Sequence, residues 1–516
     1  MDSLERLLEA ARQNENCWVN GKRLMLNWIS EQWRAASGPE RIAAGGLFCY
    51  VALAPHSIAG AEIALAIVAA GLVCGALKRK PAGWQRTALD LPLALFLLWT
   101  ILSSVFSAEP QISLAKLQST LVFGAFYLAQ ATVKRAWAGP LIFVLLLTGV
   151  VGSLWSVIDV ARGRGVIIEA MAADSPYRAT LLQPGDALWR VGGRRVSSIE
   201  EIDEAISRAP VGTELSLSAV SRGEHAEWAG FLVTPEMQTR PQPSGLSGAR
   251  PTHRFRASGW TRHYQTFADI LQMLANLALG LTLAHLARRR TGWAFRLALT
   301  TTAILLVGVA LTAMRTALVA FGAGALVMAW RAANERRARL LVLGLLGATL
   351  ALGAVMVART RAGGALRLGD DSSALRWQIA RAALARLPER PLLGHGMDAI
   401  KLHWNEWGFP GDAILHTHST PLQIAFERGL PALFLWLWLA FTAWRMTATG
   451  EHTARADTDA TRHGLLLGIT GALTGFFASS LFNYNWGDAE VVILFWWLLG
   501  IAVVAQKPDI PYNQKP

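Results

Sequence analysis

Cysteine is scarce in this chain. Only three cysteines occur in 516 residues, namely Cys17, Cys49 and Cys74, and they provide neither a disulfide framework nor a clustered zinc site. Charged residues make up only 16% of the chain. Residues 1–40 are polar and amphipathic and contain no early apolar run. We therefore expect no secretory signal peptide and interpret residues 1–40 as a cytoplasmic segment.

Hydrophobic residues are abundant instead, at 53% of the chain with a mean hydropathy of +0.32. This composition exceeds ordinary globular usage and is typical of a membrane protein. We predict an α-helical polytopic membrane protein with about twelve transmembrane helices, because apolar runs of about 16–21 residues recur along the chain. The predicted spans are 41–56, 58–77, 91–106, 117–133, 139–159, 265–287, 292–312, 315–330, 340–357, 430–447, 464–482 and 489–506.

The net charge of +13 is concentrated in short loops between the predicted spans. Loops rich in lysine and arginine are typical of the cytoplasmic side. If all of them are cytoplasmic, the spans alternate without conflict, the tail 507–516 lies inside, and no nucleic-acid partner is needed to explain the charge. Segments 160–264 and 358–429 then lie outside, which we interpret as the periplasmic side of a bacterial inner membrane. The basic loops are Lys78–Lys80, Lys134–Arg135, Arg288–Arg290, Arg331–Arg339 and Arg445–Arg462.

The first outside segment contains a small soluble α+β domain, predicted at residues 163–235 and inserted between spans five and six. β-rich runs and glycine turns flank an amphipathic helix that presents Ile199, Ile202 and Ile206 on one face. The sequence "LLQPGDALWRVGG" followed by "VSSIEEI" resembles a bacterial PDZ domain. That resemblance implies a peptide or protein partner bound by strand addition.

The peptide carboxylate would then contact a loop around Gly163-Arg164-Gly165. A spacer without any peptide ligand is the alternative. Residues 236–264, which begin with a stretch rich in Pro, Gly, Ser and Arg, are predicted to be a linker back to the membrane.

The second outside segment, 358–429, contains candidate catalytic residues. The first element predicted in it is the helix "DDSSALRWQIARAALARLP". We expect this helix to start at its Asp/Ser cap and to end before Pro388. Its apolar line runs through Leu375, Ile379 and Ala382–Ala383, and Arg376 points off that line. A turn with Gly394 and Gly396 follows, in which glycine allows the backbone to approach another group closely.

Two histidines lie in "HTHSTPLQ", residues 416–423. Thr420 and Gln423 fit a capping box with Pro421 at the first helical position, so His418 is predicted just before a helix N-terminus. The positive end of a helix favours an anion such as phosphate. The same positive end, with arginines nearby, disfavours the imidazolium and keeps His418 neutral. A neutral histidine beside a phosphate is suited to accept a proton from an attacking hydroxyl.

Arg315 falls in a very short outside loop between two predicted spans. A charge at that position is a candidate for function, and snorkelling to lipid headgroups is the alternative. Guanidinium makes planar, bidentate contacts with phosphate, so arginine suits a diphosphate.

Four blocks in this order together resemble the O-antigen ligase superfamily, which includes O-antigen polymerases and bacterial protein O-oligosaccharyltransferases. The blocks are "SSVFSAEPQISLAKL" (103–117), "AMRTALVAF" (313–321), "LRWQIARAALARLPERPLLGHG" (375–396) and "HTHSTPLQIAFERGLPALFL" (416–435). The resemblance implies transfer of a glycan from a polyprenyl-diphosphate donor to an acceptor hydroxyl, without metal, nucleotide or other cofactor. The acceptor is expected to be lipid A-core, with a growing glycan or a protein hydroxyl as the alternatives.

When the family's motifs are matched to this sequence, the resemblance implies that His418 is the base. It also implies that Arg315 and Arg376 bind the diphosphate. The family usually has Asn after the histidine, and here Ser419 stands in its place. Glu427 and Gly429 match a Glu-x-Gly motif that is expected to be structural. The candidate substrate-binding residues in these blocks are His416, Ser419, Gly394, Gly396, Arg381 and Lys116.

Other functions remain as alternatives. His416 and His418 could share a metal in an extended segment, but a third ligand at a recognisable spacing is missing. Two solvated histidines without chemistry are the plainest interpretation. A PDZ-containing metalloprotease would need His-Glu-x-x-His, which does not occur in the sequence. A transporter of the lipid-linked glycan would need charges along a mid-membrane path, whereas the notable charges are predicted at the outer face.

Overall fold

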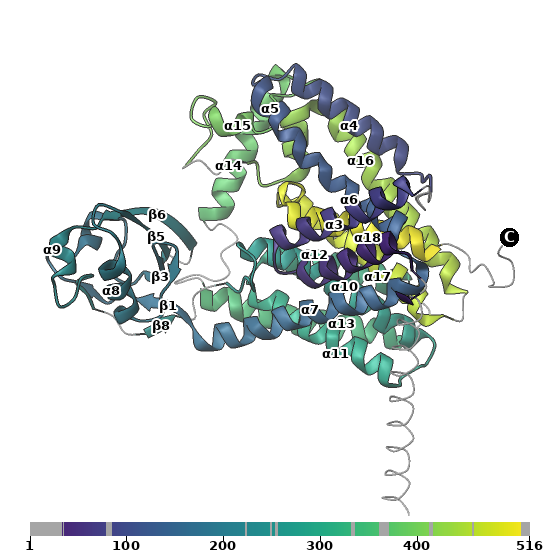
Figure 1. Ribbon diagram of the computed structural model, residues 1–516, viewed down its shortest axis with the longest axis horizontal. Helices are drawn as coiled ribbons and strands as arrows, with labels where there is room; N and C mark the ends of the chain where they lie inside the picture. The colour runs from purple at the N-terminus through teal and green to yellow at the C-terminus, as the bar shows by residue number, and fades with distance from the viewer. Residues whose placement is uncertain are drawn as a thin grey trace, which may run out of the picture.

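The computed structural model describes residues 33–34, 36–78, 85–221, 224–247, 250–252, 256–331, 336–360, 371–411, 416–456 and 459–506. It is a helical bundle with a small β domain at one end (Figure 1). The bundle contains α2 (Gly38–Leu53), α3 (Ile58–Leu77), α4 (Asp90–Val105), α5 (Pro110–Lys116), η1 (Leu117–Phe123), α6 (Gly124–Thr132), α7 (Arg135–Arg162), α10 (Tyr264–Ala287), α11 (Trp293–Leu311), α12 (Arg315–Arg331), α13 (Arg336–Thr360), α16 (Thr420–Arg455), α17 (Ala460–Ser480), η4 (Asn485–Gly487) and α18 (Ala489–Gln506).

Among the described residues, eight helices are long and apolar enough to cross a membrane. They confirm a polytopic helical membrane protein, and helices occupy all twelve predicted ranges. Four of those ranges do not meet both criteria. Helices α2 and α4, with 16 residues each, and α12, with 17 residues, are too short, whereas α17 is long enough with 21 residues but not apolar enough. The number of twelve spans therefore stays a prediction.

Helices α10, α17 and α18 form the centre of the bundle. Glycines allow α10 and α17 to approach closely, since a Cβ on Gly280 would overlap the backbone of Gly468. Small residues at crossings are typical of helices that pack in a membrane, where backbone proximity increases van der Waals contact. The side chains of Leu277, Leu473 and Trp496 are buried in the resulting core.

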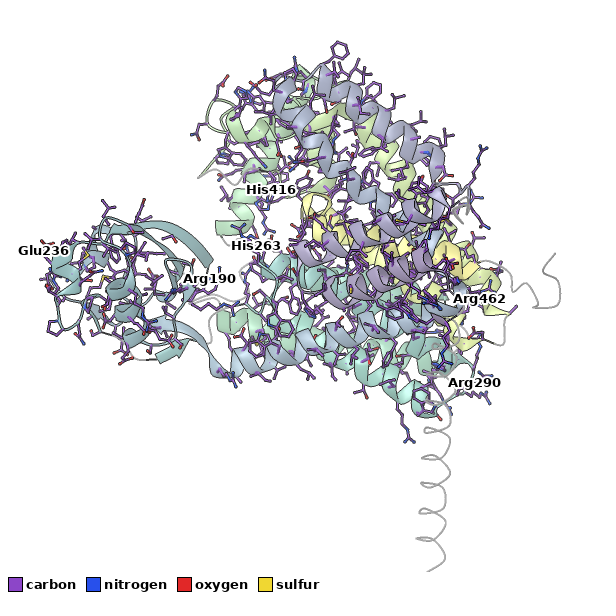
Figure 2. The ribbon with its side chains drawn as sticks, in the orientation of Figure 1. Arg190, Glu236, His263, Arg290, His416 and Arg462 are labelled. Carbon is purple, nitrogen blue, oxygen red and sulfur yellow. The ribbon has the colours of Figure 1, made fainter. Side chains whose placement is uncertain are left out.

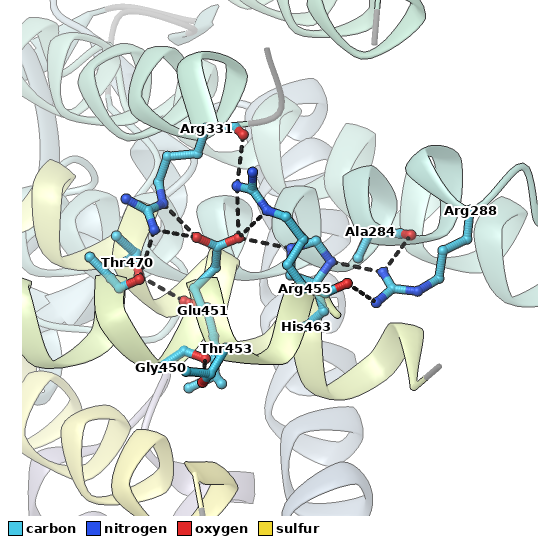
Figure 3. Close-up of polar contacts among 11 residues, drawn as sticks. Ala284, Arg288, Arg331, Gly450, Glu451, Thr453, Arg455, His463 and Thr470 are labelled. Atoms are coloured by element: carbon cyan, nitrogen blue, oxygen red, sulfur yellow. Dashed lines mark hydrogen bonds and ion pairs between the residues drawn. The ribbon is translucent and has the colours of Figure 1, made fainter. Parts of the chain in front are cut away.

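Arg290 and Arg462, which belong to two of the basic loops, lie at the end of the bundle opposite the β domain, which we call the basic end (Figure 2). Arg288, Arg331 and Arg455 surround Glu451 and His463 there (Figure 3). Glu451 accepts from Arg331 Nε at 2.6 Å and from Arg455 Nη2 at 3.1 Å, and it contacts His463 Nε2 at 2.9 Å. Three of the predicted basic loops therefore lie on the same side of the bundle, as the topology required.

The opposite end, which we call the domain end, carries the β domain. Its larger sheet has six antiparallel strands in the order β6-β5-β3-β1-β8, with β4 paired to β3, and a second sheet pairs β2 with β7. Helix α8 (Ile199–Arg208) buries Ile202 and Ile206, as predicted. The other elements are β1 (Arg164–Ile167), β2 (Ala170–Met171), η2 (Pro176–Ala179), β3 (Ala187–Val191), β4 (Arg194–Arg195), β5 (Glu214–Ser221), β6 (Glu224–Leu232), α9 (Pro235–Gln238), β7 (Leu246–Ser247) and β8 (Arg250–Thr252).

Two predictions for this domain are wrong. The expected carboxylate-binding loop is not a loop, because Arg164 begins β1, which pairs with β3 on one side and β8 on the other. The range 236–264 is not a plain linker, since β7 and β8 complete the two sheets and α10 begins at Tyr264. The PDZ resemblance itself stays a prediction.

The remaining elements cover the domain end of the bundle. Helix α14 (Asp371–Arg386) ends before Pro388, as predicted, and η3 (Leu387–Glu389) follows it. The predicted apolar line is buried at Ile379 and Ala383, which pack with Phe426 of α16 and with residues of and after α15 (Ala399–Leu402). The Asp370 cap lies outside the described residues. These contacts place α14 over the start of α16, beside the two histidines.

Candidate functional site

The two histidines lie close together at the domain end, immediately before α16. Their ring centroids are 4.3 Å apart, and the His418 backbone N–H donates to His416 Nδ1 at 3.2 Å. Because an N–H can only donate, His416 Nδ1 is an acceptor and the proton of a neutral ring lies on Nε2. His418 has a φ of 54°, a left-handed conformation that is uncommon outside glycine. The bond to His416 holds this strained backbone in place.

Both imidazoles are held in the neutral form. Burial, acting together with the neighbouring His416 and the Arg376 guanidinium, lowers the pKa of His418 to about 3. Burial lowers the pKa of His416 to about 4, with Arg376 and Lys401 acting in the same direction. Nδ1 of His418 is buried and has no hydrogen-bond partner among the described residues. Nε2 is therefore the nitrogen of His418 that a substrate would meet.

The start of α16 differs from the predicted capping box. The helix begins at Thr420 with Ser419 as its N-cap, and the Ser419 side chain makes no cap hydrogen bond. Thr420 Oγ1 instead donates to Asn485 Oδ1 at 3.0 Å and contacts the Asn483 carbonyl at 3.1 Å. Gln423 accepts from the Thr417 N–H at 2.7 Å. The capping box is wrong because the hydroxyl finds a tertiary acceptor far along the chain.

This arrangement also reduces the number of free backbone N–H groups that the N-terminus of α16 can donate to an anion. The Thr420 N–H donates to the Asn483 carbonyl at 3.2 Å, and Pro421 has no N–H. Two of the first three helical residues are thus not available to a ligand. An anion at this position depends on side-chain cations more than on the helix N-terminus.

A buried polar network that no sequence pattern indicated fixes the histidine loop. Asp269 of α10 accepts from Ser479 Oγ at 2.8 Å and from Asn483 Nδ2 at 2.9 Å. Asn485 accepts from Ser480 Oγ at 2.8 Å, in addition to Thr420. Buried polar groups that satisfy one another rigidify the structure around them. The segment 483–485 therefore connects α10 to the start of α16 and positions His418.

Arg315 and Arg376 lie around the same helix. Arg315 begins α12, and its Nη2 donates to Ser373 Oγ of α14 at 3.4 Å. Ser373 and Arg376 are three residues apart and so share one face of α14. Arg376 in turn lies close enough to lower the pKa of both histidines. Arg381 is exposed, about 140° around the helix from Arg376.

The two glycines of the turn pack against protein. Gly394 and Gly396 have φ values of 68° and 109°, and a Cβ on Gly394 would overlap the α16 backbone at Glu427–Arg428. The Gly396 N–H donates to the Glu427 carbonyl at 2.8 Å, and the Gly394 N–H donates to the Arg390 carbonyl at 2.9 Å. These amides are thus already occupied. A contact between either glycine and substrate stays a prediction.

Lys116, at the end of α5, faces the same region. Its Nζ lies 3.3 Å from Asp398 Oδ2, and Lys401 Nζ lies 2.9 Å from the same oxygen. One carboxylate oxygen thus lies between two lysines, so the positive charge of Lys116 is only partly balanced. No group of three or more His, Cys, Asp or Glu side chains in the described part of the chain is arranged to hold a metal ion.

One stretch of the chain contains most of these candidate residues, namely Arg315, Arg376, Gly394, Gly396 and the His416–Ser419 loop. Residues 300–437 match the O-antigen ligase family model. The match covers about a quarter of the chain and includes neither the β domain nor Lys116. No curated protein matches the chain. The match associates this membrane protein with glycosyl transfer in O-antigen biosynthesis, as the family resemblance implied.

Proposed function

We propose that this protein transfers a glycan from a polyprenyl-diphosphate donor to an acceptor hydroxyl on the periplasmic side of a bacterial inner membrane. The observation that carries the proposal is the convergence of His418, Arg376 and Arg315 around α14, inside the O-antigen ligase match. A hydroxyl of lipid A-core is the acceptor we favour. An O-antigen polymerase and a protein O-oligosaccharyltransferase use the same donor chemistry and are the alternatives.

In the proposed reaction, His418 Nε2 accepts the proton of the acceptor hydroxyl as its oxygen forms a bond to the anomeric carbon. The bond between that carbon and the diphosphate oxygen breaks, and the electron pair leaves with the lipid diphosphate. Arg315 and Arg376 stabilise the charge on this leaving group, as preorganised cations do at developing negative charge. Attack from the opposite face inverts the anomeric configuration. The step needs no metal.

Binding of the donor raises the pKa of the base, His418. An imidazole with a pKa of about 3 stays neutral but binds a proton weakly, whereas a general base works best when its pKa lies near the working pH. A diphosphate brings negative charge beside His418, and a nearby opposite charge favours the protonated ring. Donor binding therefore raises the pKa of His418 toward the working range, so that proton transfer follows donor binding.

The proposal is tested with purified full-length protein, a lipid-linked glycan donor and a lipid A-core acceptor. His418→Ala is expected to lower transfer about 100-fold or more, which is the usual contribution of a general base. The matched control is His403→Ala, since His403 lies in the same segment but bonds Glu109 and Glu406 instead of facing the site. Full transfer by His418→Ala would contradict the mechanism. A transporter of the glycan would tolerate the same substitution.

A further inference from the structure

A charged cluster lies near the histidines, on elements that carry neither Arg315 nor Arg376. It consists of Lys116 at the end of α5, Asp398 just before α15, and Lys401 within α15. Helices α5 and α15 lie side by side, next to α14 (Figure 1). We call these three residues the α5–α15 cluster. None of them takes part in the proposed proton transfer or in holding the diphosphate.

The cluster carries more positive than negative charge. The Nζ atoms of Lys116 and Lys401 lie 3.3 Å and 2.9 Å from the same oxygen, Asp398 Oδ2. The other carboxylate oxygen, Oδ1, accepts no hydrogen bond from any residue that the structure describes. The side chains of the two lysines are 37% and 41% exposed and that of Asp398 is 19% exposed, so a solute can reach all three. One positive charge and one carboxylate oxygen are therefore left for a ligand.

The backbone holds the Asp398 carboxylate in a fixed position. Asp398 has a φ of 59°, a left-handed conformation that is uncommon outside glycine. Its N–H donates to Glu427 Oε1 at 3.2 Å, and Glu427 is itself buried, 3.6 Å from Arg428 Nη2. Strained backbone of this kind persists only where the surrounding contacts determine it, and it is concentrated at ligand-binding sites. The bond to Glu427 thus preorganises Asp398 for a ligand.

A chain of three hydrogen bonds connects the cluster to the histidine loop. The bond from the Asp398 N–H to Glu427 is the first. Glu427 Oε1 also accepts from Gln423 Nε2 at 2.9 Å, and Gln423 Oε1 accepts from the Thr417 N–H at 2.7 Å. Thr417 lies between the two histidines in the sequence. The cluster and the proposed base are therefore parts of one connected polar structure.

The donors and acceptors of the cluster fit an anionic saccharide. A carboxylate can only accept hydrogen bonds, so Asp398 Oδ1 matches a sugar hydroxyl, which can donate one. An ammonium group only donates and is a compact point charge, so the lysines match a phosphate on the same saccharide. Lys401 is also close enough to His416 to contribute to the lowering of its pKa. A saccharide on the cluster thus lies within a short distance of the histidines, whereas a neutral ligand leaves the lysine charge unmatched.

We infer that the α5–α15 cluster binds the acceptor of the transfer reaction, and that this acceptor is a saccharide that carries phosphate. Asp398 accepts from a hydroxyl of the saccharide, and Lys116 and Lys401 hold its phosphate. The inference rests on the proposed function for the reaction itself. It favours phosphorylated lipid A-core over a neutral growing glycan or a protein hydroxyl. The donor diphosphate stays at the arginines of α12 and α14, so the two substrates reach His418 from different elements of the fold.

Steady-state transfer by the purified full-length protein, with lipid A-core varied at saturating donor, tests the inference. Asp398→Asn keeps the size of the side chain and the left-handed backbone, which asparagine tolerates, but removes the charge. The KM for lipid A-core should rise about 10- to 100-fold, since a hydrogen bond to a charged group is lost, while the KM for the donor stays unchanged. The matched control is Glu389→Gln, because Glu389 is an exposed carboxylate that pairs with Arg386 in the same segment of the chain. An unchanged KM for lipid A-core, or a change in the donor KM alone, would overturn the inference.

Lysine variants test the charge without altering the Asp398 backbone. Lys116→Met combined with Lys401→Met should weaken the binding of lipid A-core about tenfold at low salt, since charge-assisted contacts to phosphate are lost. The difference from the wild type should narrow between about 0.05 M and 0.5 M KCl, because salt screens exposed charges. Lys134→Met is the control, because Lys134 is 45% exposed and precedes the end of α7 that is farther from the β domain. A double variant that binds like the wild type at low salt would contradict the role of the lysines.

Competing ligands separate the possible sources of the phosphate. Lipid A-core treated with alkaline phosphatase should bind the wild type more weakly, and equal binding of treated and untreated lipid A-core would overturn the assignment of a phosphate. Displacement of lipid A-core by an equal concentration of phosphatidylglycerol would indicate a site for a bilayer headgroup and would overturn the assignment to the acceptor. His418→Ala should bind lipid A-core like the wild type while losing transfer. Retained transfer by His418→Ala would contradict the proposed function and leave the binding results standing.

Discussion

The pH dependence of transfer follows from the environment of His418. An ordinary histidine has a pKa of about 6.5, so at pH 5 about 30 rings are protonated for each neutral one. Burial lowers the pKa of His418 to about 3, so at pH 5 about 100 rings are neutral for each protonated one. We therefore expect kcat/KM, which reports the free enzyme, to remain flat from pH 8 down to about pH 5.

The profile of kcat should behave differently. It reports the enzyme–substrate complex, in which the donor diphosphate lies near His418. Negative charge raises the pKa of an imidazole, so the acid limb of kcat should lie at a higher pH than the acid limb of kcat/KM. A difference of at least one pH unit corresponds to about 1.4 kcal/mol of interaction between the donor and the imidazolium.

Initial rates of the purified protein between pH 4 and 9 show whether kcat/KM stays flat and locate the acid limb of kcat. One other histidine has to be controlled for, because hydrogen bonds to Glu406 and Glu109 raise the pKa of His403 above its ordinary value. His403 is then protonated at higher pH than a free histidine. The profile should therefore be repeated with His403→Gln. An acid limb of kcat/KM near pH 6.5 that persists in that variant would refute the role assigned to the buried His418.

Three further predictions concern the structure that supports the site. Glu451→Gln removes the fully buried carboxylate that pairs with half-buried Arg331 and should cost about 3–5 kcal/mol in thermal unfolding, with transfer per folded molecule unchanged. Gly429→Ala should lower the yield of folded protein, because Gly429 has φ 81° and ψ 171°, a glycine-only conformation costing about 1–3 kcal/mol in other residues. Its control, Gly344→Ala, lies in a helix with open space around the Cβ position and should be neutral or stabilising in the same assay. Thr420→Val removes the bonds to segment 483–485 and should lower kcat more than it changes KM, since it displaces the base and not the donor ligands.

Local patterns predicted the helices well. The line through Leu375, Ile379 and Ala383 has helical spacing, and burial of that face needed no information beyond the sequence. The break at Gly429 also falls where a predicted outside segment met a predicted span, because glycine is the residue that permits the kink. In both places, the deciding interaction lies within a few residues of the pattern itself.

The errors occur where the deciding partner is distant in sequence. The Thr420 hydroxyl fits a cap pattern, but it bonds residues 63 and 65 positions away. Likewise, the polar composition of 236–264 is typical of a linker, yet β8 pairs with β1 across most of the domain. Arg428 shows the same limit, because its identity as a buried arginine without a full set of acceptors depends on which groups surround it. Sequence spacing carries no signal for a missing partner.

The first segment of α16 is anchored at both of its ends. His418 lies just before its first residue, Thr420, and Arg428 is its last residue before the kink at Gly429. Nine helical residues span about 13 Å, so the two ends of the segment are held at a fixed separation. Segment 483–485 anchors one end, and the amides of His395 and Gly396 bond the carbonyls of Phe426 and Glu427 at the other. The histidine loop at the start of the segment therefore cannot shift independently of the turn at Gly394 and Gly396, and this rigidity keeps His418 in the geometry that the proposed reaction needs.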